Sequence, residues 1–329
     1  MNRLSPLSAA VLRGCGSLLA PGGRNGSLLV LIYHRVLAQP DPLLPDEPDV
    51  TAFAAQMDVI RATCQVLPLA EAVERLYSGS LPPRAACITF DDGYANNLTC
   101  AAPVLAQRRM PATVFIATGF IGGGRMWNDT VIEAVRRAGA ELDLAALGLG
   151  RYSLPDVESR RRAFQAIINA LKYREPAERL GKATQIAERV GSDLPTDLML
   201  AESQLKQLRG AGLEVGAHTV THPILARLDS AAAKREIAAS KSYLEAVVGE
   251  PVRLFAYPNG RPTQDYERQH VDMVRAAGFA AAVSTAWGSG NRGSDRFQLP
   301  RLLPWDRSPV RFAARLLRAY GQTRSDLAQ

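Results

Sequence analysis

The stretch Thr89-Phe90-Asp91-Asp92-Gly93-Tyr94 places two adjacent carboxylates directly after an apolar run, Ala85-Ala86-Cys87-Ile88. The run predicts a buried strand, and Gly93 supplies the turn that ends it. Because side chains alternate along a strand, Asp91 and Asp92 cannot both point into a core, and an unpaired buried carboxylate is costly. One of them can hold a metal ion while the other acts as a base beside it. The alternative is a pair that caps a following helix.

A second polar segment, Gly216-Ala217-His218-Thr219-Val220-Thr221-His222-Pro223, follows another short predicted strand, Leu213-Glu214-Val215-Gly216. His218 and His222 are four residues apart, so one helical turn places both imidazoles on the same face, within reach of one cation. Such pairs often arise by chance on a surface, yet these are two of only four histidines in the chain. With Asp92 they form a three-ligand set that leaves a coordination position open for water, as in catalytic metal sites.

The third segment, Leu254-Phe255-Ala256-Tyr257-Pro258-Asn259-Gly260-Arg261-Pro262, is an apolar strand that runs into a Pro-Asn-Gly turn. Exposed amides of such a turn can donate to a developing oxyanion, although alone it is an ordinary turn. In this order and spacing, the three segments resemble the polysaccharide deacetylase family, carbohydrate esterase family four, with its NodB homology domain. The T-F-D-D-G and H-[ST]-x-x-H motifs match its first two signatures. The resemblance runs from about Leu28 to about Pro304 and is interrupted by a poorly matching insertion.

The resemblance implies an α/β fold, a distorted (β/α) barrel of the NodB type with a helical insertion. It also implies hydrolysis of the N-acetyl group of an amino sugar in a polysaccharide or its precursor. By the same resemblance, Asp91 is the general base, Asp92, His218 and His222 bind a divalent metal, and the backbone N–H of Asn259 helps to hold the oxyanion. Zinc is the expected metal, with cobalt, nickel and iron as alternatives. Such an ion lowers the pKa of bound water toward about 7 and polarises the acetyl carbonyl.

Two positions depart from the family pattern. Ala256 stands where the third motif usually carries an arginine, and Phe297-Gln298-Leu299-Pro300-Arg301-Leu302 stands where the last motif usually ends in Leu-x-His. The protein is therefore inactive, or other residues supply the acid and the partner of the base. We predict His34 as the acid, because it ends the apolar run Leu28 to Arg35 and strand ends of a parallel barrel converge on one face. The alternative is a hydrogen-bonded structural histidine.

Tyr-His near the start and Y-P-x-G in the third motif are similar to the branch of the family that acts on biofilm poly-N-acetylglucosamine. Arg301, at a late strand end, is predicted to pair with Asp91 and keep it ionised. The alternative is a surface arginine or a purely structural ion pair. His270 lies on a polar helical stretch, where we expect it to be solvated.

Three aromatic residues are predicted to contact substrate: Tyr94, Tyr257 and Trp127. For Trp127 a buried anchor is an equal alternative to a sugar-stacking ring. Asp129 precedes an apolar-periodic run, so we expect a helix cap there rather than a catalytic group.

The length of 329 residues suits one barrel with embellishments. We predict a helical extension over 1–27, the barrel over 28–329 with its insertion at about 127–200, and an amphipathic helix at about 308–320. An acidic Pro-rich loop over 41–48 should rim the site. Further helices are predicted over 53–62, 69–77, 97–108, 232–247 and 265–276, and strands over 111–117 and 279–283.

The net charge is +7 and the pI about 9.4, but no basic cluster is interleaved with aromatics, so nucleic acid is discounted as a partner. The expected partner is an N-acetylated polysaccharide or oligosaccharide. We expect the basic C-terminal helix to pack on the barrel, with peripheral membrane contact as the alternative. The oligomeric state is left open.

Apolar residues in Met1 to Ala20 are interrupted by Arg13 and Gly14, so we expect no signal peptide, and no stretch is long enough for a transmembrane helix. The four cysteines show no disulfide or zinc spacing, which favours the cytoplasm, including the inner membrane surface where lipid-linked precursors occur. Besides the deacetylase, two functions compete: a hydrolase of small non-peptide amides on the same barrel, and a catalytically silent carbohydrate-binding module.

Overall fold

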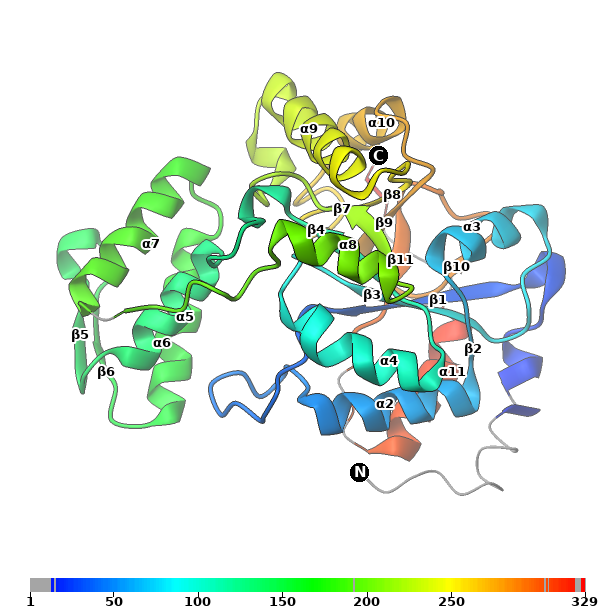
Figure 1. Ribbon diagram of the computed structural model, residues 1–329, viewed down its shortest axis with the longest axis horizontal. Coiled ribbons are helices and arrows are strands. Elements are labelled where there is room, and N and C mark those ends of the chain that lie inside the picture. The colour runs from blue at the N-terminus through cyan, green and yellow to red at the C-terminus, as the bar shows by residue number, and fades with distance from the viewer. Residues whose placement is uncertain are drawn as a thin grey trace.

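The computed structural model describes residues 13–14, 16–191, 193–304, 306, 308–322 and 327–328. Its central parallel strands lie in the order β1 (Ser27–Tyr33), β3 (Ala85–Phe90), β4 (Thr113–Ile116), β7 (Glu214–Ala217), β8 (Leu254–Ala256), β9 (Ala281–Trp287) and β11 (Leu299–Arg301). After β11, Leu302 exchanges backbone hydrogen bonds with Val30 and Ile32 of β1. The sheet therefore curls back on its first strand as a nearly closed barrel (Figure 1), which confirms the predicted fold class.

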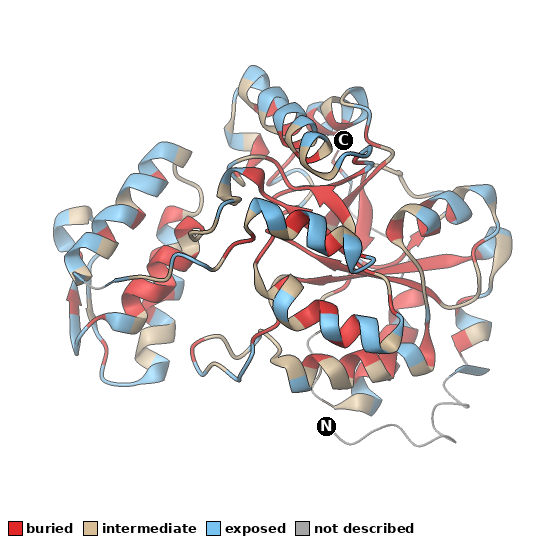
Figure 2. Ribbon diagram, in the orientation of Figure 1, coloured by how far each residue is buried: buried red, intermediate tan, exposed pale blue. Residues whose placement is uncertain are grey.

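Every residue of β1 and of β3 is buried, as expected for parallel strands covered on both faces. Two short strands extend the sheet: β2 (Gln65–Val66) pairs with β3, and β10 (Gly290–Asn291) runs antiparallel to β1. Helices surround the strands with their buried faces inward (Figure 2). They are α2 (Val50–Thr63), α3 (Leu69–Ser78), α4 (Ala102–Arg108), α8 (Glu202–Gly210), α9 (Ser230–Val248), α10 (Arg268–Ala276) and α11 (Pro309–Tyr320).

The predicted helices and strands are present, with shifted ends. The stretch predicted as one helix over 97–108 is a π-helical turn, Asn97–Ala101, followed by α4. The predicted helix start at Asp265 is wrong. The Asp265 carboxylate accepts the Arg261 N–H at 3.0 Å and so closes a turn, and α10 begins only at Arg268.

The stretch assigned to the insertion folds as a lobe beside the barrel (Figure 1, left). It contains α5 (Trp127–Arg137), the hairpin of β5 (Glu141–Asp143) and β6 (Arg151–Ser153), α6 (Val157–Leu171) and α7 (Pro176–Val190). The lobe has its own apolar core, which also receives Leu43 from the loop between β1 and α2. Two lobe arginines hold this loop, since Arg136 pairs with Asp41 and Arg161 donates to the Pro42 carbonyl.

The C-terminal helix α11 packs against α2 and β1, with Phe312, Leu316 and Tyr320 buried. Packing is therefore the observed arrangement, and membrane contact stays a prediction. Of the predicted N-terminal extension, residues 1–12 and Cys15 lie outside the described residues, whereas 13–14 and 16–19 are helical. Cys64, Cys87 and Cys100 are free thiols. Among the described residues, no helix combines the length and apolar character needed to cross a bilayer.

Candidate metal and catalytic site

The chain leaves the extended conformation abruptly after β3. Asp91 donates its N–H to the Tyr33 carbonyl of β1 at 2.9 Å, and Asp92 then adopts φ = 75°. His222 and Asn259 also have positive φ, at 52° and 57°. Non-glycine residues in this region cost about 1–3 kcal/mol each and persist where the surroundings hold them. The strain therefore marks the three loops that carry the predicted site.

These loops bring Asp92, His218 and His222 together, with ligand atoms all within 4.8 Å of one another. The Asp92 Oδ1 atom lies 3.5 Å from His218 Nε2 and 3.3 Å from His222 Nε2. The two imidazole centroids are 4.8 Å apart. Asp92 and His218 are buried and His222 is half-buried, so the three form a compact cluster of one carboxylate and two imidazoles.

Several features of this set fit a divalent cation. His218 Nδ1 lies 2.7 Å from the Ala256 carbonyl, so the N–H is used there and the Nε2 lone pair faces Asp92. Asp92 Oδ1 is buried without a hydrogen-bond partner. Burial raises the pKa of Asp92 to about 7 and lowers the pKa of His218 to about 4. A cation would relieve the buried carboxylate, and the neutral imidazoles are in the form that binds metal.

The guanidinium of Arg301 forms a bidentate ion pair with the Asp91 carboxylate, as predicted. Its Nη1 and Nη2 donate to the two Asp91 oxygens at 2.7 and 2.8 Å, and its Nε donates to the Ser284 carbonyl at 2.8 Å. Arg301 is 2% exposed. Burial alone would raise the pKa of Asp91, but the charge and hydrogen bonds of Arg301 outweigh it and hold that pKa at about 2. The surface alternative for Arg301 is therefore excluded.

His34 lies half-buried at the end of β1, and its backbone carbonyl accepts a hydrogen bond from Asn97 at 2.9 Å. No described residue hydrogen-bonds its imidazole. Burial lowers the pKa of His34, but the carboxylates of Asp92, Asp91 and Glu47 outweigh this and leave it raised above 6.5. The charges of these carboxylates therefore favour the protonated form of the His34 imidazole.

Asn259 lies at the turn after β8, where Thr285 donates to its carbonyl at 2.7 Å. The structure gives the Asn259 N–H no acceptor within the described part of the chain. This amide is therefore free to donate to a ligand, as the predicted oxyanion role requires.

Three of the predicted side chains are enclosed by protein. Trp127 is 7% exposed, and the Arg179 guanidinium carbon lies 4.9 Å from its ring centroid, so its environment is that of the buried anchor. The Tyr257 ring stacks on Tyr266 with centroids 3.9 Å apart and is fully buried, so it cannot offer a face to a sugar. The expectation of a solvated His270 is wrong: it is 1% exposed, and its Nδ1 accepts the Glu267 N–H at 2.9 Å.

Tyr94 belongs to a buried cluster that sequence reasoning missed. Its hydroxyl lies 3.2 Å from both oxygens of Asp129, and Arg35 Nη1 lies 3.4 Å from the same carboxylate. Asp129 also accepts the Met126 N–H at 3.1 Å, so it does cap α5, from the third helical position. The cluster ties the lobe to the strand end that carries His34. The one available signal was the position of Arg35, directly after that histidine.

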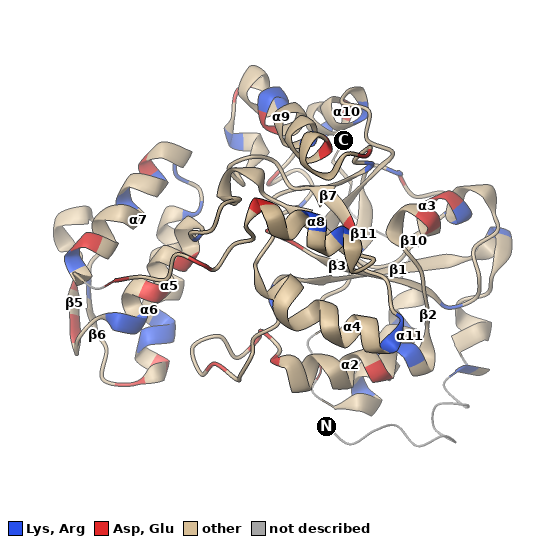
Figure 3. Ribbon diagram, in the orientation of Figure 1, with Lys and Arg blue, Asp and Glu red and all other residues tan. Residues whose placement is uncertain are grey.

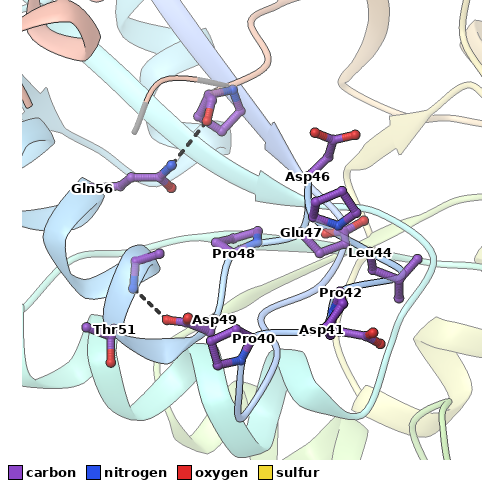
Figure 4. Close-up of a pocket in the computed structure, with 13 residues that line it drawn as sticks. Pro40, Asp41, Pro42, Leu44, Asp46, Glu47, Pro48, Asp49, Thr51 and Gln56 are labelled. Carbon is purple, nitrogen blue, oxygen red and sulfur yellow. Dashed lines mark hydrogen bonds between the residues drawn. The ribbon is translucent and has the colours of Figure 1, made fainter. Parts of the chain in front are cut away.

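A cavity of about 520 Å³ lies within the loop between β1 and α2, bounded also by the start of α2 and by Pro304 (Figure 4). Prolines and the carboxylates of Asp41, Asp46, Glu47 and Asp49 line it. Glu47 accepts the N–H of Arg35, the residue after His34, at 3.3 Å, so the acidic loop approaches this strand end; that it rims an active site stays a prediction.

Comparison with known proteins agrees with this geometry. The profile of the family described as "Polysaccharide deacetylase" matches residues 78–282, more than half of the chain. YxkH of Bacillus subtilis (strain 168), whose name places it among polysaccharide deacetylases, is 24% identical over 113 residues. That match covers 34% of this chain and 39% of YxkH, so the chain spans well under two thirds of this relative.

Solved structures share the fold. IcaB from Ammonifex degensii superposes with a TM-score of 0.59 at 21% identity, covering 91% of this chain and 98% of that one. The Streptococcus pyogenes deacetylase PplD, solved with acetate, gives 0.58 at 17% identity, covering 89% and 98%. The deacetylase domain of BpsB from Bordetella bronchiseptica gives 0.53 at 18%, covering 84% and 95%. Since the family profile spans more than half of the chain, including both carboxylates and both histidines of the site, this protein belongs to the polysaccharide deacetylase family.

Proposed function

We propose that this protein is a metal-dependent deacetylase that removes N-acetyl groups from amino sugars of a polysaccharide or its precursor. The observation that carries the proposal is the pairing of two adjacent carboxylates with opposite environments. Asp91 is held ionised by Arg301, whereas Asp92 has a buried oxygen with no hydrogen-bond partner and faces two imidazoles. A base beside a cation site is the arrangement that amide hydrolysis needs.

Asp92, His218 and His222 would hold the divalent metal, with zinc the proposed ion. When bound, such a metal supplies an acidified water and polarises the acetyl carbonyl. The protein's own contribution is orientation, since the Ala256 carbonyl fixes the tautomer of His218 and the strained φ of Asp92 aims its carboxylate.

Four further groups divide the remaining work in this proposal. Asp91 accepts the proton of the attacking water, and Arg301 keeps that carboxylate ionised at neutral pH. Asn259 donates its N–H to the oxygen that becomes negatively charged. His34 returns a proton to the departing amine, a role that its raised pKa supports.

The substrate class rests on the sequence motifs. Tyr33-His34 and Tyr257-Pro258-Asn259-Gly260 match the branch that acts on poly-N-acetylglucosamine, so an exopolysaccharide of N-acetylated amino sugars is the proposed substrate. Tyr94 is 3% exposed, and Arg35 covers its ring with the guanidinium 4.7 Å from the centroid, so in this proposal it supports the strand end that carries His34 and does not stack on a sugar. The proposed place of action remains the cytoplasm or the inner membrane surface.

Acetate release and metal content together test the proposal. Asp91→Asn should retain metal and lose turnover on N-acetylglucosamine oligomers, whereas Asp92→Asn should lose both. Asp143→Asn, at an exposed carboxylate of the lobe, is the matched control. Full metal occupancy in Asp92→Asn would contradict the ligand assignment, and turnover in Asp91→Asn would contradict the base. Hydrolysis of small non-peptide amides alone would favour the alternative hydrolase, and oligosaccharide binding without turnover the silent module.

A further inference from the structure

Four cationic side chains lie against Tyr173 or on and beside the loops that carry His222 and Asn259. They are Lys172, Arg179, Arg227 and Arg261, and we call them the basic rim. The Lys172 ammonium and the Arg227 guanidinium each lie 5.5 Å from the Tyr173 ring centroid. Within the described part of the chain, none of the four has a carboxylate at ion-pair distance.

Arg179 is the most unusual member of the basic rim. It is 4% exposed, its Nε has no hydrogen-bond partner, and its guanidinium lies over the Trp127 ring. Its Nη2 lies 3.4 Å from the carbonyl oxygen of His222, and its Nη1 lies 3.4 Å from that of Lys172. A buried guanidinium without a counter-ion is costly unless an anion approaches, so the structure holds uncompensated positive charge next to a metal ligand.

The exposed members of the basic rim sit on the loops that shape the site. Arg227 belongs to the short 3-10 turn Leu225–Arg227, five residues after His222, and Arg261 follows Asn259 by two residues. Gln264 donates to the Tyr173 hydroxyl at 2.8 Å, which joins the Asn259 loop to the lobe. The basic rim therefore extends from the metal ligands toward solvent over two adjacent strand ends.

Nearby carboxylates do not neutralise the basic rim. The charges of Lys172, Arg227 and Arg261 act on Asp265, but none of the three is at ion-pair distance from it. One oxygen of Asp265 accepts the backbone N–H of Arg261. The charge of Glu175 also acts on Arg179, although the two are not at ion-pair distance. With Glu236, which accepts the Val220 and Thr221 N–H groups, three carboxylates stand against four cations and a net positive charge remains.

The opposite side of the site has the reverse sign. The loop between β1 and α2 carries Asp41, Asp46, Glu47 and Asp49, and its acidic segments appear red in Figure 3. Glu47 accepts the N–H of Arg35, next to His34, at 3.3 Å, whereas the Arg179 guanidinium lies 3.4 Å from the carbonyl oxygen of His222. A substrate with a negative group would therefore be oriented, since the cations of the His222 side have no described carboxylate at ion-pair distance, whereas Arg35 and Arg136 on the other side are paired with Asp129 and Asp41.

From this asymmetry we infer that the basic rim binds an oxyanion, a phosphate or carboxylate carried by the N-acetylated glycan next to the sugar that reacts. The inference rests on the proposed function, because it assigns the substrate class of the same site. In this inference the side chains of Arg227, Arg261 and Lys172 contact the anion. The buried charge of Arg179 attracts it without direct contact. Exposed charge pairs contribute about 0.2–1 kcal/mol each, so two contacts of about 0.7 kcal/mol amount to about a tenfold preference at low salt.

Three substrates test it on the full chain loaded with zinc: a neutral N-acetylglucosamine oligomer, the same oligomer with a terminal phosphate, and the same oligomer oxidised to a terminal carboxylate. Acetate release gives kcat/KM for each, at low and high ionic strength. We expect the phosphate or carboxylate oligomer to exceed the neutral one about tenfold at low salt, and the ratio to fall at high salt. The two charged oligomers identify which oxyanion is preferred.

The double variant Arg227→Gln/Arg261→Gln should bring the ratio of charged to neutral kcat/KM close to one. The double variant Arg311→Gln/Arg318→Gln, on the exposed face of α11, removes the same charge and should keep the wild-type ratio. A wild-type ratio at or below one would overturn the inference. So would a ratio that the Arg227/Arg261 variant leaves unchanged, or that both variants lower equally.

Calorimetric titration with the same oligomers separates this inference from the proposed function. If no oligomer releases acetate, the deacetylase proposal fails. The basic rim would still be supported if the charged oligomers bind more tightly than the neutral one and the Arg227/Arg261 variant loses that difference. Equal affinity for all three oligomers would contradict oxyanion binding at the basic rim, whether or not acetate is released.

Discussion

Replacing Arg301 by methionine keeps most of the side-chain volume but leaves the Asp91 carboxylate buried without its cation. The wild-type guanidinium makes two hydrogen bonds to that carboxylate, at 2.7 and 2.8 Å, and is 2% exposed. Removing one partner of a buried ion pair costs about 3–5 kcal/mol. The free energy of unfolding at pH 7 should therefore fall by about that amount in Arg301→Met.

The pH dependence gives a second, independent readout. In the wild type the pKa of Asp91 is about 2, below its ordinary value, so the ion pair stabilises the fold above about pH 4 and this contribution is lost as pH falls through about 2. An adjacent arginine accounts for about one to three units of such a shift. In Arg301→Met the pKa should rise by at least that amount, because burial then acts unopposed by the guanidinium.

Activity should follow the same titration. A base works only when ionised, so the acidic limb of the kcat/KM profile should move up by about one to three pH units in Arg301→Met. The stability deficit should shrink at low pH, where protonation removes the unpaired charge. The acidic limb of Arg301→Lys should lie between those of the wild type and Arg301→Met, because lysine keeps the positive charge but loses the bidentate geometry.

Arg151→Met is the control, because Arg151 pairs with Asp143 on the exposed hairpin of the lobe, where an ion pair contributes at most about 1 kcal/mol. An acidic limb in Arg301→Met that coincides with the wild type would refute the role of Arg301 in setting the base. An unchanged unfolding midpoint would refute the energetic argument.

Three further predictions concern the rest of the site. His34→Gln should lower kcat about 10²–10⁴-fold with metal content intact, and should flatten the basic limb of the pH–rate profile; unchanged kcat would exclude His34 as the acid. Removing metal with a chelator should lower the melting temperature of the wild type, because a ligand at 100 times its Kd stabilises the fold by about 2.7 kcal/mol. In His222→Gln the chelator should leave the melting temperature unchanged. An equal fall in melting temperature in both proteins would contradict the assigned ligands. Burial raises the pKa of Asp129 to about 6, although the charge of Arg35 opposes the shift. Protonated Asp129 therefore adds to the free energy of unfolding below about pH 4, and this contribution is lost as pH rises through about 6. The stability of Asp129→Asn relative to wild type should therefore increase from pH 4 to pH 7, by up to about 3 kcal/mol, and a flat difference in thermal unfolding would show that Asp129 titrates normally.

Two residues of the proposed site, His34 and Arg301, lie outside the part of the chain that the family profile covers, residues 78–282. Arg301 occupies β11, which pairs with β9, and reaches Asp91 across 210 residues of sequence. The ion pair expected in place of the missing arginine at Ala256 of β8 is thus present, with its arginine on β11, two strands farther along the sheet.

The sequence by itself determined the elements of the barrel and the positions of its polar strand ends. Apolar runs such as Leu28 to Tyr33 and Ala85 to Phe90 have the composition of strands buried on both faces, and this property is local. Asp91 and His218 follow such runs directly, so their convergence could be predicted from the geometry of a parallel barrel.

The tertiary structure alone decided which side chains are accessible. Tyr257 and Trp127 have the residue types of a sugar-binding surface, but Tyr266 and Arg179, distant in sequence, cover their rings. His270 lies on a polar helix and is nevertheless buried. Burial depends on which segments pack together, and a local pattern contains no information about the partner that will cover it. The residues of the proposed metal site could therefore be predicted from motifs, whereas their surroundings required the packed fold.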